Sequence, residues 1–293
     1  MKLDAIKFGL TTAAACALAL VGCSGDDGES ETTVAATGSA DDGGTDSPGD
    51  DTGSETAGDD ADDGATDSPT GDADDGPVGV GEDPPTFDCA AATGTLDQKF
   101  VTIGDEFNDI DLLDGIRVID GNLDINRTNY NNLDFLLCIE EITGDLTIFG
   151  NDFLVDASGS NTMTVLGGDF VFTENSVIEV FNGMTGVKEI AQSADPDTGA
   201  PIYHSIVMNR NETMVEIAGW DTLDLIFGNI TIRDNPSLTS IDGFKGLLGI
   251  GFTLAITHNP ELCISSVNCV GAGIESPKVP PASWTTTANN EGC

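Results

Sequence analysis

The second half of the chain repeats one pattern of apolar and polar positions with a period of 24 residues. Relative to Ile230, called position 0, apolar residues stand at positions −4, +2, +8, +11, +14, +17 and +20. A repeat this short cannot bury its own apolar face, so each copy has to stack on its neighbours. Position 0 recurs at spacings of 23, 24, 36, 24 and 24 residues, as Leu123, Leu146, Phe170, Ile206, Ile230 and Leu254.

Each copy opens with a segment of period 2, such as Gly144-Asp-Leu-Thr-Ile148, in which positions 0 and +2 are apolar. This alternation predicts a β-strand with every second side chain pointing inward. The later apolar residues recur every three positions, which fits short extended pieces and corners, although one helical turn per coil would give a similar spacing. We therefore expect an all-β fold, a right-handed β-helix or solenoid of about seven coils, over residues 87–293.

The alignment of the copies makes further predictions about register. The spacing of 36 residues contains a turn-rich insertion of about 12 residues around 192–201. Position −4 is assigned to Ile119, Ile142, Leu166, Ile202, Ile226 and Ile250. A degenerate earlier coil is assigned to Val101, Ile103, Phe107, Ile110, Leu113, Gly115 and Ile119.

Asparagine recurs at position +5, where its amide can bond to the backbone of the next coil. We interpret this column as a structural asparagine ladder and not as a ligand site. Glycine recurs at positions −2 and +13, where it permits tight corners. The ladder residues are Asn151, Asn175, Asn211, Asn235 and Asn259.

Residues 1–22 have the pattern of an export signal, with Lys2 and Lys7 before an apolar core too short for a permanent membrane span. The core ends in Leu20-Val-Gly-Cys23, which resembles the lipobox of bacterial lipoproteins. The resemblance implies cleavage before Cys23, acylation (palmitate included) at Cys23 and a membrane anchor. Ser24 favours the outer membrane in the sorting pattern of such proteins. An ordinary signal peptide is the alternative.

Residues 23–86 are expected to be a disordered acidic tether. Residues 24–86 contain 16 Asp and 4 Glu but no Lys, Arg or His, and too few apolar residues to fold. The folded part is also acidic, with 30 Asp and Glu against 8 Lys and Arg over 87–293. That charge argues against nucleic acid as a partner, because nucleic-acid binding depends on neutralising phosphates.

The mature domain has five cysteines, and in an exported protein these favour disulfides. Cys138 is expected to pair with Cys89, and Cys263 with either Cys293 or Cys269, which leaves one thiol free or paired between molecules. The chain has no C-x-x-C pair and only two histidines, which argues against a zinc site. We found no cofactor motif.

Two stretches carry a family resemblance. The segment 138–148, Cys-Ile-Glu-Glu-Ile-Thr-Gly-Asp-Leu-Thr-Ile, resembles the opening of a receptor L domain. Asn259-Pro-Glu-Leu-Cys263 resembles its closing coil, and Trp284 before a last cysteine is similar as well. This family includes the ligand-binding lobes of the insulin and epidermal growth factor receptors. The resemblance covers roughly residues 89–293 and implies a leucine-rich-repeat-like β-helix, but it places no ligand residues on this chain.

Among functions, polysaccharide-active enzymes fit a β-helix but need clustered acids with a base, or two opposed carboxylates. The outward acidic residues form no such column. Tyr130, Phe149 and Phe153 fall on adjacent coils at positions +7, +3 and +7, and could form an aromatic patch for a sugar ring or a peptide, or be ordinary exposed aromatics. We expect a non-catalytic recognition or adhesion module for a glycan or protein ligand. The alternatives are a polysaccharide-active envelope enzyme and a structural spacer.

Overall fold

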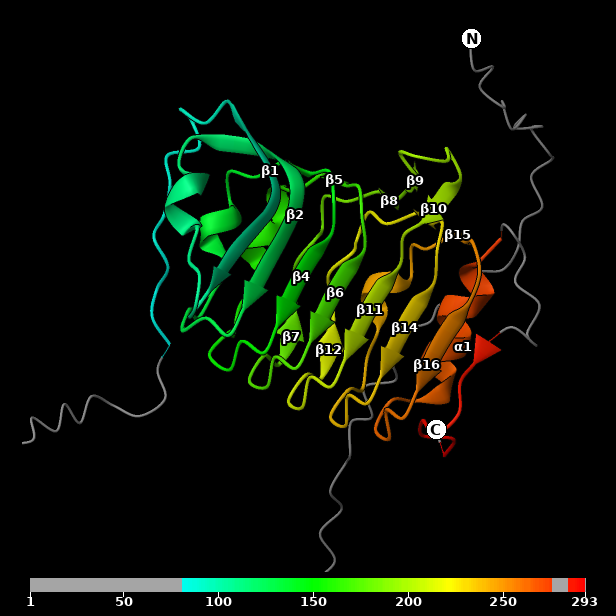
Figure 1. The fold of residues 1–293 in the computed structure, drawn as a ribbon. Coiled ribbons are helices and arrows are strands. Elements are labelled where there is room, and N and C mark those ends of the chain that lie inside the picture. The colour runs from blue at the N-terminus through cyan, green and yellow to red at the C-terminus, as the bar shows by residue number, and fades with distance from the viewer. Residues whose placement is uncertain (1–80, 276–283, 293) are drawn as a thin grey trace, which may run out of the picture. The chain divides into compact units, whose positions relative to one another are not determined.

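The computed structural model describes residues 81–275 and 284–292, which wind into a parallel β-solenoid (Figure 1). It has about seven coils of about 24 residues and little helix, as the sequence repeat predicts. Successive coils lie side by side, and each gives one strand to a parallel sheet that runs along the molecule. The expected all-β solenoid is therefore confirmed.

The principal sheet is built from positions 0 and +2 of every coil. Leu146 lies opposite Phe170 and Ile148 opposite Phe172, so equivalent positions of adjacent coils are in register. Side chains at these two positions are buried, because alternate residues of a strand point to the same face. In spatial order the strands are β1 (Gly94–Gly104), β2 (Ile116–Asn126), β4 (Leu146–Phe149), β6 (Phe170–Thr173), β11 (Ile206–Asn209), β14 (Ile230–Arg233), β16 (Leu254–Thr257) and β17 (Trp284–Thr285).

A second row of short strands comes from position −4. It begins at β2 and runs through β3 (Glu141–Ile142), β5 (Val165–Leu166), β8 (Glu189–Ile190), β13 (Leu225–Ile226) and β15 (Gly249–Ile250). Here the alignment was wrong at one coil. Ile190, and not Ile202, lies opposite Leu166 and Ile226 in this row. The inserted residues lie between positions −4 and 0, so counting back from Ile206 gave the wrong isoleucine.

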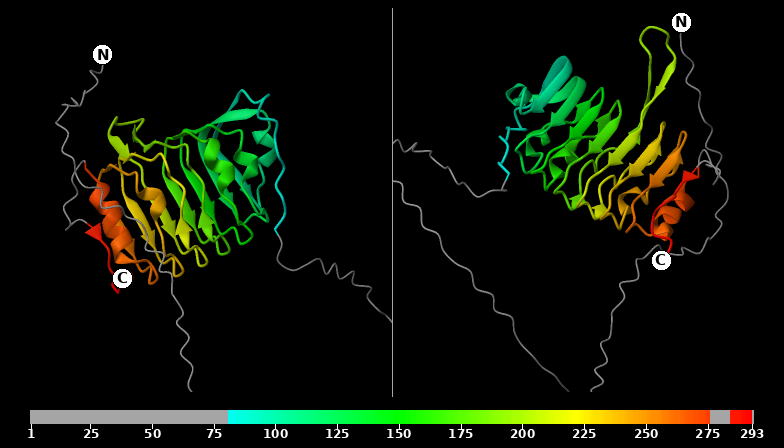
Figure 2. Two further views of the ribbon diagram at one scale, coloured as in Figure 1. Left: turned by 180° about the vertical axis from the view of Figure 1, so that it is seen from behind. Right: turned by 60° about the horizontal axis from the view of Figure 1, so that its bottom comes forward.

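The insertion forms an antiparallel hairpin of β9 (Gln192–Ala194) and β10 (Pro201–Tyr203). It projects from the solenoid, as the right-hand view of Figure 2 shows. Ile202 is 40% exposed on it, and the Tyr203 ring packs edge to face on Phe252 with centroids 4.8 Å apart. This aromatic contact fixes the hairpin against the seventh coil.

The remaining side of each coil is made of short turns. The three-residue spacing of apolar positions gives 3-10 helices in some coils and two-residue strands in others, so both sequence interpretations hold in part. The 3-10 helices are η1 (Ile110–Leu113), η2 (Asp134–Leu136), η3 (Ser158–Thr162) and η4 (Asp242–Phe244), and the strands are β7 (Val180–Phe181) and β12 (Glu216–Ile217).

Aromatic side chains fill the interior of the middle coils. The Phe170 ring meets Trp220 edge to face with centroids 4.9 Å apart, and Trp220 stacks on Phe244 at 6.3 Å. All three side chains are buried. At the N-terminal end the first coil is present, but Phe107 is 69% exposed and does not belong to its core. The chain turns back there, and Asn108 pairs with Ile103 in an antiparallel bridge.

Disulfides lie at both ends of the solenoid. The predicted bond between Cys89 and Cys138 is present. Cys263 and Cys269 are also disulfide-bonded, and Cys293 lies outside the described residues. The helix α1 (Ile264–Gly273) covers the last coil, where a Cβ at Gly271 would lie 1.5 Å from the Trp284 ring. Only glycine lets the helix approach this closely.

The first described residues already contact the solenoid. The backbone nitrogen of Glu82 donates to the Asn129 carbonyl at 2.7 Å, and Asn131 donates to the Glu82 carbonyl at 2.9 Å. The ordered part therefore begins at least by residue 81, six residues before the boundary expected from composition. The rest of the proposed tether and the export signal lie outside the described residues.

Candidate ligand groove beside an asparagine ladder

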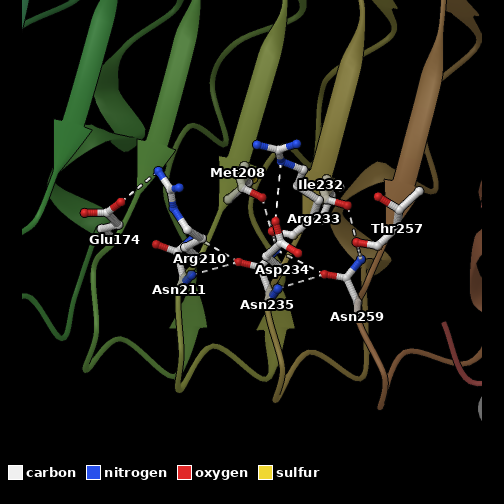
Figure 3. A network of polar contacts seen from close by, with 10 residues as sticks. All are labelled: Glu174, Met208, Arg210, Asn211, Ile232, Arg233, Asp234, Asn235, Thr257 and Asn259. Carbon is white, nitrogen blue, oxygen red and sulfur yellow. Dashed lines mark hydrogen bonds and ion pairs between the residues drawn. The ribbon is translucent and has the colours of Figure 1, made fainter. Parts of the chain in front are cut away.

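The five recurrent asparagines form a continuous buried ladder along one corner of the solenoid, and Figure 3 shows Asn211, Asn235 and Asn259 of it. The side-chain oxygen of Asn235 accepts the Asn211 backbone N–H at 3.0 Å, and that of Asn259 does the same for Asn235 at 3.1 Å. Each side-chain nitrogen donates to a carbonyl of the preceding coil, as from Asn235 to Met208 at 3.0 Å. With donors and acceptors occupied inside the protein, the ladder is structural.

The ladder extends beyond the five residues that the sequence singled out. At the N-terminal end Thr128 takes the place of asparagine, and its backbone and hydroxyl both donate to Asn151 at 2.9 Å. At the other end Asn289 accepts the Asn259 backbone N–H at 3.2 Å. The sequence could have predicted Asn289 as a ladder residue, because it follows Trp284 by the same five residues that separate the other asparagines from position 0.

A second polar ladder runs along position −1, and sequence analysis missed it. The Asp145 carboxylate accepts the Asp169 backbone N–H at 2.7 Å, and the Asp169 carboxylate accepts that of Ser205 at 2.7 Å. The full column is Asn122, Asp145, Asp169, Ser205 and Asn229, ending on the backbone of Thr253. The column does not stand out in the sequence, because asparagine, aspartate and serine each supply the side-chain oxygen that accepts the hydrogen bond.

Position +4, directly before the asparagine, is left-handed in every coil from the second to the seventh. Non-glycine residues rarely adopt a positive φ, since the Cβ then crowds the following carbonyl. In this column the backbone has to turn so that the next side chain can enter the ladder. The residues and φ angles are Arg127 48°, Gly150 64°, Glu174 58°, Arg210 53°, Asp234 57° and His258 58°.

An open groove of about 500 Å³ lies over this corner on the second to fifth coils. Phe149 and Phe153 line it together with Arg127 and Arg210. Two of the three aromatic residues proposed as a patch are thus brought together. The other groove residues include Thr128, Asn129, Gly150, Asp152, Glu174, Ser176 and Glu212.

Tyr130 does not join the other two aromatic residues. It lines a smaller neighbouring hollow of about 270 Å³, and its ring packs on Phe135 with centroids 5.8 Å apart. Its hydroxyl accepts a hydrogen bond from Asn108 at 3.4 Å. Tyr130 is therefore half-buried at the edge of the core. Arg127 lines both hollows.

The charged residues of the groove are arranged unevenly. The Arg210 guanidinium forms an ion pair with Glu174 at 2.7 Å, which joins two coils (Figure 3). The Asp152 carboxylate accepts a hydrogen bond from Ser176 at 2.7 Å. Arg127 instead lies over the Phe149 ring, with its guanidinium carbon 5.2 Å from the centroid. The groove therefore presents one stacked cation beside two partnered acids and a third acid, Glu212.

Asp145, Asp169 and His204 form a separate cluster whose potential ligand atoms lie within 4.8 Å of one another. Its carboxylates belong to the position −1 ladder and bond to backbone N–H groups of the next coil. The Nε2 atom of His204 forms a hydrogen bond of 2.8 Å with the hydroxyl of Ser193, which lies in the inserted hairpin. These hydrogen bonds give the three residues a structural role, in which they hold the hairpin against the solenoid.

No protein-family model, curated protein or solved structure matches this chain. Within the described ranges, none of the helices has the length and apolar character needed to cross a bilayer. The groove is therefore interpreted from its own chemistry.

Proposed function

We propose that this chain is a lipid-anchored lipoprotein of the cell envelope, on the outer membrane, whose solenoid is a non-catalytic recognition module for a glycan. The observation that carries the proposal is the corner groove, which two aromatic rings of the third coil line together with the guanidinium groups of the second and fifth coils. Ligand sites combine apolar and aromatic walls with a few polar groups that fix orientation. A row of sugar rings fits a groove that crosses several coils.

The charged residues of the groove support binding over catalysis. Glycosidases place two carboxylates on either side of the scissile bond, one as acid and one as base or nucleophile. Here Glu174 is held by Arg210, and Asp152 accepts a hydrogen bond from Ser176. These two carboxylates are held by neighbouring side chains, so among the described groove residues Glu212 alone offers an unengaged carboxylate, where a glycosidase needs two. The polysaccharide-active enzyme remains the second candidate and is tested by the same experiment.

Calorimetry tests the recognition proposal. The full chain in mild detergent is titrated with envelope and exopolysaccharide fractions, while the length of the glycan is followed by chromatography. We expect saturable heat with a fixed stoichiometry, unchanged glycan length, and loss of binding in Phe149→Ala and Phe153→Ala. Val155→Ala is the matched control, because Val155 is exposed on the same coil but does not line the groove.

Other outcomes separate the alternatives. Shortened glycan would replace the recognition proposal with an enzyme. Silence in every fraction would overturn glycan recognition in favour of a protein ligand or a spacer.

The anchor is tested separately. Mass spectrometry of the mature protein should find an N-terminal Cys23 that carries acyl chains, and Cys23→Ser should release the protein from membranes. Several chains are needed for firm anchoring, since a single acyl chain binds only marginally. An unmodified N-terminus at another residue would overturn the lipoprotein assignment and leave the groove proposal untouched.

A further inference from the structure

Arg127 differs from every other arginine of the chain. The chain has four arginines, and three form ion pairs: Arg117 with Glu140, Arg210 with Glu174 and Arg233 with Asp234. No carboxylate among the described residues pairs with Arg127, although acidic residues outnumber basic ones 51 to 10 in the whole sequence. A lone arginine is unexpected on a surface with so many acids.

The environment of Arg127 keeps its donors available. Its guanidinium faces the Phe149 ring, and such stacking leaves the in-plane N–H groups free for other partners. The next coil has Gly150 at the equivalent position, and a Cβ there would lie 3.4 Å from the Arg127 Cγ. A Cβ at that distance would make an ordinary van der Waals contact, so the arginine stem lies beside this position without crowding.

Arg127 also occupies a backbone position that favours glycine. Its φ of 48° is left-handed, and a non-glycine residue there costs about 1–2 kcal/mol. Gly150 shows that glycine is accepted in this column. Four other non-glycine residues share this strain, but Arg127 is the arginine that contributes no ion pair to the described fold and exposes its charge in the groove. Such a residue is placed for a ligand.

We propose that Arg127 recognises a carboxylate on the bound glycan, so that the ligand contains uronic-acid units. This inference rests on the proposed recognition function of the groove. A guanidinium binds a carboxylate through two parallel hydrogen bonds, and the adjacent Phe153 offers a ring for the sugar that bears it. The shared chemistry is an oxyanion, and a phosphate group on the sugar is the other source that the test distinguishes.

The charge of the domain restricts the ligand further. With 30 acidic and 8 basic residues over 87–293, the surface repels a polyanion with a charge on every sugar. At physiological salt this repulsion extends about 8 Å, which is beyond a single sugar unit. The ligand therefore carries isolated acidic sugars among neutral ones.

The probe is a xylan oligosaccharide that carries a single glucuronic acid, compared with the same oligosaccharide after carboxyl reduction and with a phosphorylated counterpart. Affinities are measured by calorimetry on the full chain. We expect the acidic probe to bind about tenfold more tightly than the reduced one, the size of a charge-assisted hydrogen-bonded pair at an exposed site. Arg127→Gln should remove this difference, so that the acidic and the reduced probe bind with equal affinity.

Arg233→Gln is the matched control, because Arg233 is paired with Asp234 and does not line the groove. It should leave the preference intact. One outcome would overturn the carboxylate inference and leave glycan recognition standing. In it, the acidic and reduced probes bind equally, Arg127→Gln has no effect, and Phe149→Ala abolishes binding. Tighter binding of the phosphorylated probe would overturn the uronic-acid assignment. Absence of binding by all three probes would count against both proposals.

Discussion

The side-chain oxygen of Asn235 lies 3.0 Å from the backbone nitrogen of Asn211, one coil earlier. The Asn235 side chain also donates to the Met208 and Arg233 carbonyls at 3.0 and 3.2 Å. One side chain therefore bonds to backbone groups on two coils, its own and the preceding one. Because these groups are buried, the ladder holds the coils in register at the corner under the groove.

Asn235→Ala should be strongly destabilising. It leaves several buried donors and acceptors without partners, and each such group costs about 1–3 kcal/mol. We expect the free energy of unfolding to fall by about 3–5 kcal/mol, measured by urea denaturation. The matched control is Asn209→Ala, since the buried side-chain oxygen of Asn209 has no hydrogen-bond partner among the described residues and its removal leaves no backbone group unpaired. A similar loss in both variants would contradict the role of the ladder.

Gly243→Ala tests how closely the coils approach on the side opposite the principal sheet. A Cβ on Gly243 would lie 1.8 Å from the carbonyl oxygen of Gly219 in the preceding coil, so the two coils would have to separate. We expect a loss of about 2–4 kcal/mol in thermal or urea unfolding. Gly246→Ala is the control, because its Cβ would meet nothing closer than 3.7 Å. Equal stabilities of the two variants would be inconsistent with this close contact.

Much of this architecture follows directly from the sequence. Columns such as Leu146, Phe170 and Ile206 fix the period, because stacked coils require equivalent positions to be apolar. The asparagine column could also be recognised from the sequence, since asparagine alone occupies position +5 in five consecutive coils. The pairing of Cys89 with Cys138 was also expected from their places at the end of the solenoid.

Other features could not be read from spacing alone. Ile202 and Ile190 both match the column, and only the pairing with Leu166 decides between them. The grouping of Phe149 with Arg127 depends on the left-handed backbone at position +4, and the pattern of side chains does not predict that conformation. Tyr130 shares a column with Phe153, yet it packs on Phe135 of its own coil, and the spacing of that coil is 23 residues instead of 24.

The strain at Arg127 makes a prediction about stability. At a left-handed position glycine is favoured over alanine by about 1 kcal/mol, so Arg127→Gly should be more stable than Arg127→Ala. At Arg233, one residue before the left-handed column in β14, the order should reverse, because glycine weakens an extended strand. The four variants are compared by urea denaturation. The same order at both sites would contradict the strain assigned to position +4.

Acid sensitivity should depend on Asp156, which links the third and fourth coils. Burial alone would raise the pKa of this carboxyl, but hydrogen bonds from Ser158 and Asn182 outweigh it and hold the pKa below its ordinary value of 3.8. The two bonds measure 2.8 and 3.0 Å. A carboxyl with a depressed pKa in the folded state stabilises the fold above the unfolded-state pKa, and that contribution is lost as the pH falls through the folded-state pKa.

The stability difference between the wild type and Asp156→Asn should therefore be constant from about pH 7 to pH 5 and shrink below about pH 4. Urea denaturation at several pH values measures it. Asp97→Asn is the control, because Asp97 is exposed on β1 and none of the described residues donates a hydrogen bond to its carboxylate. Its difference from the wild type should not change over the same range. A difference at Asp156 that persists unchanged into acid would show that the ionised carboxylate does not hold the two coils together.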